Sequence, residues 1–204
     1  MRATTIFFIS AAATLGIAAC TQDTASETEP AEQAEQIESE PMEHSGPAVG
    51  EAIPADFLTL DATGAERRLD DLVGENGIVL AFNRSADWCS VCQAQLVEFR
   101  DLEADLEARG YTLATLSYDA PAVLAEFSER EDIGYTMLSD EGSAMIDAFD
   151  LRDPQYGEGS FANGVPRPAI LVIGTDGTVR AKMVESDYRE RPELSDIVAA
   201  VDAL

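Results

Sequence analysis

Between residues 49 and 204, the hydrophobic positions follow two patterns that alternate along the chain. Uninterrupted apolar runs at 78–82 and 169–173 are typical of strands that are buried on both faces of a sheet. After the first run, apolar side chains recur at helical spacing and Gly110 ends the pattern. The recurring positions are Leu96, Phe99, Leu102 and Leu106. The pattern therefore predicts a strand at 78–82, a helix at 93–109 and a second buried strand at 169–173.

Shorter signals complete the order of elements. The pattern predicts strands ending at Leu60 and covering 111–117, 135–138 and 178–184, a helical turn at 68–73, helices at 121–130, 142–149 and 192–204, and a polar, glycine-rich loop at 150–164. This order of strand, helix, strand, helix, hairpin and helix favours an α/β fold, with a central mixed sheet and helices on both faces. We expect one such domain over residues 49–204.

The first 20 residues have the pattern of an export signal. Arg2 supplies the positive charge, and a short apolar stretch follows it. The stretch ends in Ile17-Ala-Ala-Cys20, which resembles the lipobox of bacterial lipoproteins and implies a lipid on Cys20. The alternative is a cleaved secretion signal that leaves Cys20 as a spare thiol. Thr21 replaces the aspartate that retains such lipoproteins at the inner membrane, so the resemblance implies the outer membrane in a Gram-negative host.

Residues 21–48 have the composition of a disordered acidic linker. No Lys or Arg occurs between Arg2 and Arg67, and Glu, Gln, Ala, Ser and Thr dominate the segment. We expect no specific role for His44, the one histidine of the chain. The formal net charge of the 204 residues is -26, which excludes nucleic acid as an expected partner because phosphates need clustered Lys and Arg.

Cys89 and Cys92 are the chemically distinctive pair. They follow the strand at 78–82 and open the predicted helix, where unpaired N–H groups stabilise a thiolate. At positions i and i+3 their Cα atoms would be about 5 Å apart, within reach of a disulfide. A structural disulfide is the plainer interpretation, but closing so short a loop stabilises a fold little. With no third cysteine or histidine nearby, a zinc site is not expected.

The motifs in this order resemble the thioredoxin fold in its AhpC/TSA, peroxiredoxin-like branch. The resemblance rests on Pro54-x-x-Phe57, Trp88-Cys89-Ser-Val-Cys92 and the strand that follows Pro168. It implies that Pro168 occupies the place of the cis-proline that packs on the cysteine pair in thioredoxin-like proteins. Peroxiredoxins carry Pro-x-x-x-Thr-x-x-Cys, which places Cys92 at the peroxide-attacking position and Cys89 at the threonine.

The resemblance leaves two chemistries open. As a disulfide oxidoreductase, the protein would use Cys89 as nucleophile and Cys92 to resolve the mixed disulfide. As a peroxidase, it would use Cys92 as the peroxidatic cysteine and Cys89 as the resolving one. Trp88 is expected to shield the pair, while Arg84 and Arg167 are candidates to assist a thiolate or bind a peroxide oxygen.

The sequence thus favours a lipid-anchored thiol–disulfide oxidoreductase on the periplasmic side of the cell envelope. The first alternative is an antioxidant thiol peroxidase, and the second is a tethered, non-enzymatic binding domain with a structural disulfide. Expected partners are protein thiols or disulfides, or peroxide, together with an envelope thiol reductant. No haem, flavin or nucleotide motif is present, so no cofactor is expected.

Overall fold

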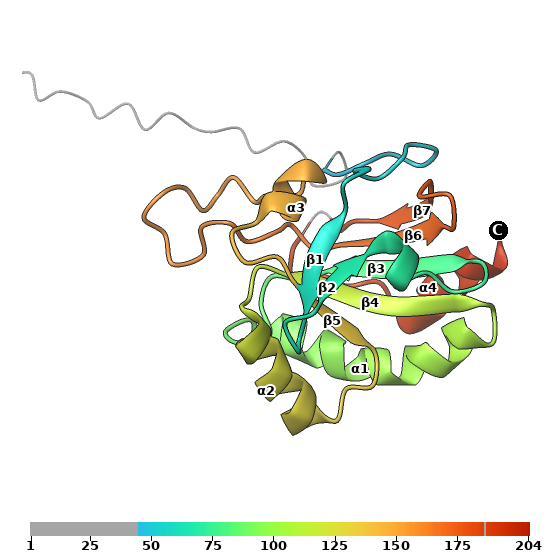
Figure 1. The fold of residues 1–204 in the computed structure, drawn as a ribbon, viewed down its shortest axis with the longest axis horizontal. Coiled ribbons are helices and arrows are strands. Elements are labelled where there is room, and N and C mark those ends of the chain that lie inside the picture. The colour runs from blue at the N-terminus through green and yellow to red at the C-terminus, as the bar shows by residue number, and fades with distance from the viewer. Residues whose placement is uncertain (1–44, 186) are drawn as a thin grey trace, which may run out of the picture. The chain divides into compact units, whose positions relative to one another are not determined.

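The computed structural model describes residues 45–185 and 187–204 (Figure 1). Seven strands form one mixed sheet in the order β2-β1-β5-β4-β3-β6-β7. The strands are β1 (Leu58–Asp61), β2 (Glu66–Arg68), β3 (Gly77–Phe82), β4 (Tyr111–Ser117), β5 (Thr136–Ser139), β6 (Ala169–Gly174) and β7 (Val179–Met183). The predicted mixed α/β sheet is confirmed.

The centre of the sheet is its most apolar part. All six residues of β3 are buried, as are all six of β6. β3 pairs in parallel with β4 and antiparallel with β6, which gives every backbone group of its middle a partner inside the sheet. A strand in this position needs apolar side chains toward both faces, and this explains the uninterrupted runs in the sequence.

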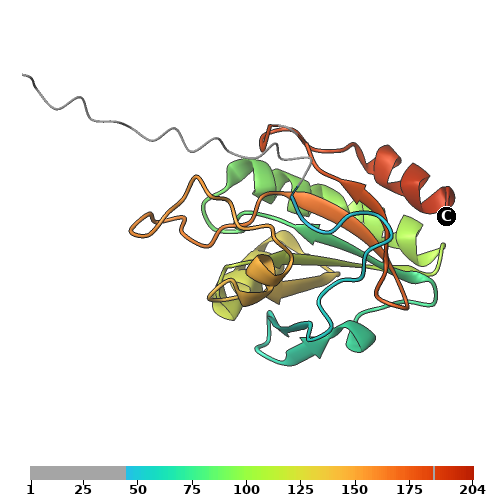
Figure 2. The same cartoon turned by 90° about the horizontal axis from the view of Figure 1, so that it is seen from above.

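Helices cover both faces of the sheet, as expected. The helices are α1 (Ser90–Glu107), α2 (Pro121–Glu131), α3 (Ala144–Ala148) and α4 (Leu194–Asp202), with a 3-10 turn at Leu69–Asp71. One apolar cluster joins one face of the sheet to α1, α2 and α4, and another joins the opposite face to α3 and the N-terminal segment. In Figure 1, α1 and α2 lie on one side of the sheet and α3 on the other; Figure 2 shows α4 beside α1.

Two features differ from the expectation. The strand β2 was not predicted because its three residues are polar and lie at the edge of the sheet, where no burial imposes alternation. The folded part also extends to Ser45, four residues before the expected start at Val49. Ser45 is buried, and the Gly46 N–H donates to the Asp150 carbonyl at 3.1 Å.

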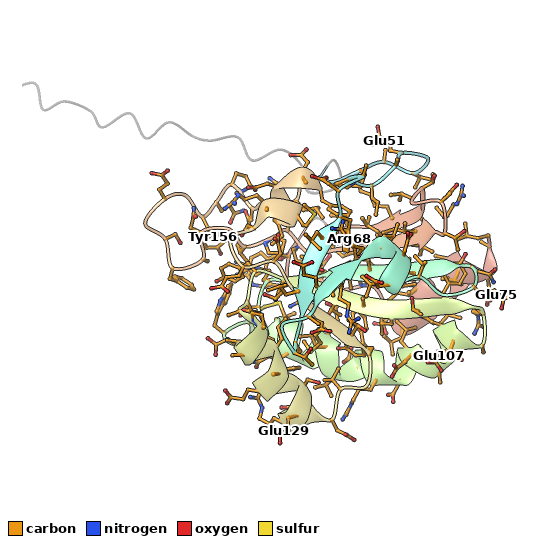
Figure 3. All side chains as sticks on the ribbon, viewed as in Figure 1. Glu51, Arg68, Glu75, Glu107, Glu129 and Tyr156 are labelled. Carbon is orange, nitrogen blue, oxygen red and sulfur yellow. A yellow bond between two sulfur atoms is a disulfide. The ribbon has the colours of Figure 1, made fainter. Side chains whose placement is uncertain are left out.

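The predicted signal segment with Cys20, most of the 21–48 linker and His44 lie outside the described residues. Within the ranges 45–185 and 187–204, no helix is both long and apolar enough to cross a membrane. The surface carries much of the acidity: Glu51, Glu75, Glu107 and Glu129 are all exposed and stand at the periphery of the domain in Figure 3.

Candidate active site

Cys89 and Cys92 form a disulfide where the polypeptide passes from β3 into α1. Their Cα atoms are 5.2 Å apart, as the spacing predicts. Cys89 is the N-cap of α1, and its Sγ accepts a hydrogen bond from the Cys92 N–H at 3.3 Å. The pair thus sits among the free N–H groups of a helix start, where negative charge on sulfur is stabilised. This arrangement suits thiol chemistry better than simple cross-linking.

A buried carboxylate holds the loop that precedes the cysteines. Asp119, just beyond β4, accepts hydrogen bonds from the Ser85 hydroxyl at 2.8 Å and from the Ala86 N–H at 2.7 Å. The Ser85 Oγ in turn accepts the N–H groups of Asp87 and Trp88 at 3.0 and 3.3 Å. Burial raises the pKa of Asp119, although its hydrogen bonds favour the ionised form. Ser85 therefore fixes this loop through its hydrogen bonds to Asp119 and to the backbone N–H groups of Asp87 and Trp88.

Cys89 is the more exposed of the two cysteines. Its residue exposure is 7%, whereas Cys92 is fully buried. Trp88 is half-buried beside it and donates its indole N–H to the Tyr118 hydroxyl at 2.9 Å. Asp87 is exposed, and Cys89, not Asp87, is the N-cap of α1. A bulky thiol from solution would therefore meet the Cys89 sulfur before that of Cys92.

Arg191 contacts Cys92, although no sequence pattern pointed to this residue. Its Nη2 lies 3.7 Å from the Cys92 Sγ, and its Nε donates to the Gln95 Oε1 at 2.9 Å. The Glu190 carbonyl accepts from its Nη1 at 2.6 Å, and the Tyr188 carbonyl accepts from the same atom. Burial and, secondarily, the nearby charge of Arg84 lower its pKa to about 10, so it stays charged at neutral pH. The guanidinium is thus fixed against Cys92 by four contacts.

Arg84 is fully enclosed near the same site. Its guanidinium carbon lies 4.2 Å from the ring centroid of Tyr188, 5.0 Å from that of Tyr156 and 5.3 Å from that of Trp88. Its Nη2 donates to the Tyr156 hydroxyl at 2.6 Å, while its Nε has no hydrogen-bond partner in the described chain. Three aromatic faces compensate part of the cost of burying this cation. Arg84 therefore joins the loop at 150–164 and the 187–193 segment to the cysteine loop.

Arg167 is engaged elsewhere. Its guanidinium donates to the Ser45 hydroxyl of the N-terminal segment, and none of its hydrogen bonds reaches a cysteine. The expectation that Arg167 assists the thiols is therefore not supported. Arg167 precedes β6 in the sequence, whereas Arg191 follows β7 and provides the contact with Cys92.

The prediction of a cis-proline at Pro168 is wrong. No described peptide bond is cis. The residues before Pro168 already run as extended backbone: Pro166 pairs with Arg152, and the Arg167 N–H donates to the Leu151 carbonyl at 2.7 Å. A trans peptide continues this extended path into β6, whereas cis-prolines are typical of tight turns. Pro168 nevertheless lies near the site, since it lines a pocket together with Gln95 and Arg191.

That pocket is small, about 10 Å³, so it admits a group of about the size of one water molecule. Apolar groups, namely Phe82, Pro168 and Met183, form part of its wall, while Gln95, Tyr188 and Arg191 supply polar atoms. Among the described residues, no three His, Cys, Asp or Glu side chains gather as a metal would require. The site therefore offers two thiols, a fixed guanidinium and a small pocket, a set that is suited to thiol redox chemistry.

Comparison with known proteins also indicates thiol redox chemistry. The AhpC/TSA family model matches residues 49–182. Peroxiredoxin Bcp of Escherichia coli strain K12 is 27% identical over 123 residues, which are 60% of this chain and 77% of the relative.

Solved structures resemble the whole domain. The crystal structure of peroxidoxin BcpB from Mycobacterium tuberculosis has a TM-score of 0.65 at 25% identity and covers 79% of this chain and 99% of its own. A peroxiredoxin 6 mutant of Arenicola marina has a TM-score of 0.66 at 24% identity and covers 77% of this chain and 73% of its own, which supports the fold.

Proposed function

We propose that this chain, which belongs to the AhpC/TSA family, is a thiol peroxidase. In this proposal, Cys92 attacks the peroxide and Cys89 then reacts with the oxidised Cys92 to form the disulfide. Family membership makes the protein a thiol-dependent oxidoreductase, and the relatives it matches are named peroxiredoxins. The non-enzymatic binding domain is therefore set aside. The Trp-Cys-x-x-Cys motif favoured a disulfide as the substrate, with peroxide as the alternative. We now prefer peroxide as the substrate and keep disulfide as the alternative.

The cycle uses the two cysteines in sequence. The Cys92 thiolate attacks one oxygen of a hydroperoxide; the O–O bond breaks, an alcohol or water leaves with a proton, and Cys92 becomes a sulfenic acid. The Cys89 thiol then attacks the Cys92 sulfur, and the S–O bond breaks as water leaves. The product is the Cys89–Cys92 disulfide present in the structure. A thiol reductant must supply two electrons to restore both thiols.

The position of Arg191 is the observation that carries this assignment of roles. Its guanidinium contacts the sulfur of Cys92, and no described cation has a hydrogen bond to that of Cys89. A fixed positive charge at 3.7 Å favours the thiolate over the thiol, and the thiolate is the nucleophile. It would also stabilise the negative charge that moves onto the peroxide oxygens as the O–O bond breaks. Gln95 and two backbone carbonyls hold the group, so it need not reorganise during the reaction.

Single-cysteine variants test the proposal. The reduced full chain, its Cys89→Ser variant and its Cys92→Ser variant are mixed with hydrogen peroxide in a stopped-flow instrument. Fluorescence of Trp88, the one tryptophan of the chain, reports the reaction beside it. We expect Cys89→Ser to stop at a sulfenic acid that a dimedone probe traps at Cys92, and Cys92→Ser to react no faster than free cysteine. Rapid peroxide consumption by Cys92→Ser would refute the assigned roles.

The disulfide oxidoreductase remains the second candidate, because Cys89 carries features of an attacking thiol. It caps α1, its Sγ accepts a hydrogen bond from the Cys92 N–H, and it is the more exposed of the two cysteines. An insulin-reduction assay compared with the peroxide assay separates the two activities. Turnover of disulfide substrates that exceeds peroxide turnover, and that is lost in Cys89→Ser, would reverse our preference.

We also propose that the protein acts in the cell envelope, attached to a membrane by a lipid on Cys20. Support comes from the Ile17-Ala-Ala-Cys20 sequence and from the linker-like composition of residues 21–48. Metabolic labelling with an alkyne fatty acid tests the modification. Incorporation that persists in a Cys20→Ser variant would contradict it.

A further inference from the structure

The loop at 150–164 has a defined structure that the peroxide chemistry does not explain. It projects from the body of the domain on the side away from the C-terminus in Figures 1 and 2, and Figure 3 labels Tyr156 on it. Tyr156 receives the hydrogen bond from Arg84, and Ala162 and Val165 are fully buried. The Gly164 carbonyl accepts from the Ser143 hydroxyl at 2.8 Å. Contacts at Tyr156 and at Gly164 therefore hold the loop against the rest of the domain.

Phe161 is exposed although its neighbours are anchored. It is 77% exposed, the highest value among the four large apolar side chains that are exposed in the described ranges. The next residue, Ala162, is fully buried, and the Tyr118 hydroxyl approaches the Phe161 carbonyl at 3.5 Å. The backbone thus fixes the ring on the surface. A single exposed apolar side chain is common on protein surfaces, but this ring is held in place by its backbone and belongs to a larger aromatic surface.

The ring of Phe161 stands against Trp88. Their centroids are 5.3 Å apart and their planes are inclined by 76°, an edge-to-face arrangement. The indole is in turn oriented by its hydrogen bond to Tyr118. Trp88 and Phe161 together form what we call the aromatic platform, and it begins at the residue before Cys89.

We infer that the aromatic platform is the docking surface for a protein dithiol that reduces the Cys89–Cys92 disulfide. This inference rests on the proposed function, because a peroxidase cycle must reduce its disulfide at every turn. Cys89 is the more exposed of the two cysteines, at 7% against a fully buried Cys92, so we expect an incoming thiolate to attack Cys89 and Cys92 to leave as a thiolate against Arg191. The reductant must therefore settle on the Cys89 side, where the platform lies.

The exchange balances within the two proteins. One partner thiolate bonds to the Cys89 sulfur while the Cys89–Cys92 bond breaks. The second partner thiol then attacks the partner's own sulfur in the mixed disulfide, which releases Cys89. The partner ends as a disulfide, and both cysteines of this chain end reduced. A small thiol needs no aromatic surface for this reaction, whereas aromatic side chains dominate the affinity of protein interfaces. The platform therefore fits a protein reductant with apolar surface around its thiol.

The test compares two reductants on three forms of the full chain: wild type, Phe161→Ala and the control Val49→Ala. Val49 is a second exposed apolar residue, with 61% exposure, on the N-terminal segment. Reduced thioredoxin, regenerated by its reductase and NADPH, serves as the protein dithiol, and dithiothreitol serves as the small thiol. NADPH consumption or the mass shift after alkylation measures disulfide reduction, with no peroxide present.

We expect Phe161→Ala to lower kcat/KM for thioredoxin about tenfold, mainly through KM. The rate with dithiothreitol should stay within twofold, Val49→Ala should behave as wild type, and Phe161→Tyr should recover most of the loss. Equal thioredoxin rates for Phe161→Ala and Val49→Ala would overturn the inference, as would an equal loss with both reductants. A wild-type disulfide that thioredoxin reduces no faster than dithiothreitol does would also overturn it. Failure of the peroxide assay would instead refute the proposed function, because disulfide reduction is read separately.

Discussion

Removing the charge of Arg191 should raise the pKa of the Cys92 thiol and slow the peroxide reaction. At 3.7 Å, two unit charges attract by about 4.5 kcal/mol at an effective dielectric constant of about 20, and by about 1.1 kcal/mol in bulk water. Arg191 is half-buried, so its effect lies between these limits. Since one pKa unit corresponds to about 1.4 kcal/mol, we expect Arg191→Gln to raise the thiol pKa by about 1 to 2 units.

The measurement isolates one thiol at a time. In a background that carries both Cys20→Ser and Cys89→Ser, the rate of alkylation by iodoacetamide against pH gives the pKa of Cys92, with and without Arg191→Gln. At pH 7, the thiolate fraction and hence the peroxide rate should fall about tenfold, and should recover as pH rises above the new pKa. Arg180→Gln is the matched control, because Arg180 is an exposed arginine paired with Asp176 at 2.7 Å.

Three results would refute the reasoning. The first is a Cys92 pKa that changes by less than about 0.3 units in Arg191→Gln, well below the smallest shift that Coulomb attraction in water gives. The second is an equal change in Arg180→Gln. The third is a larger pKa shift at Cys89, measured in a background that carries both Cys20→Ser and Cys92→Ser. That result would show that Arg191 acts on Cys89 and not on Cys92.

Three further predictions concern charged groups near the site and at the sheet edge. Asp119→Ala should lower the free energy of unfolding in urea by about 1 to 3 kcal/mol, because the buried Ala86 N–H loses its acceptor. Asp119→Asn should lower it less, and equal losses for the two variants would contradict this account. Arg84→Met should raise the Cys92 pKa less than Arg191→Gln does in the same alkylation assay, since no hydrogen bond joins Arg84 to either sulfur; a larger rise would make Arg84 the main thiolate partner. Burial opposes ionisation of Asp61, but hydrogen bonds outweigh it and lower its pKa to about 2. The ionised Asp61 therefore stabilises the fold by about 1 to 2 kcal/mol above pH 4, and this contribution is lost as pH falls toward 2. The difference in unfolding free energy between wild type and Asp61→Asn should shrink over that interval. A difference that stays constant from pH 4 to pH 2 would contradict this account.

The sequence predicted most of the fold because burial imposes clear patterns on its central elements. The residues of β3 and β6 face helices or loops on both sides and so had to be apolar. The inner face of α1 had to repeat every three or four residues, and its start at the cysteine pair followed from the end of the preceding strand. The polar edge strand β2 and the buried Ser45 were missed, because neither carries an apolar pattern.

The chemistry of the site was predictable only in part. The spacing of Cys89 and Cys92 is local, so the 5.2 Å separation of their Cα atoms followed from helical geometry. The prediction of a cis-proline at Pro168 was wrong. The two residues before Pro168 pair as extended backbone with Leu151 and Arg152, and this contact cannot be read from the local sequence. Arg167 was selected for its place beside that proline, but its side chain turns to Ser45.

The sequence by itself determined the Cys89–Cys92 pair, the α/β order and the place of the pair at a helix start, since these depend on neighbours within a few residues. Only the tertiary structure decided which sulfur Arg191 contacts and which of the two cysteines is the more exposed. Arg191 lies 99 residues beyond Cys92 and Phe161 lies 73 beyond Trp88, and both pairs meet because the chain folds back across the carboxyl ends of β3 and β4. Contacts at that separation depend on packing, and a single sequence carries no periodic signal for them.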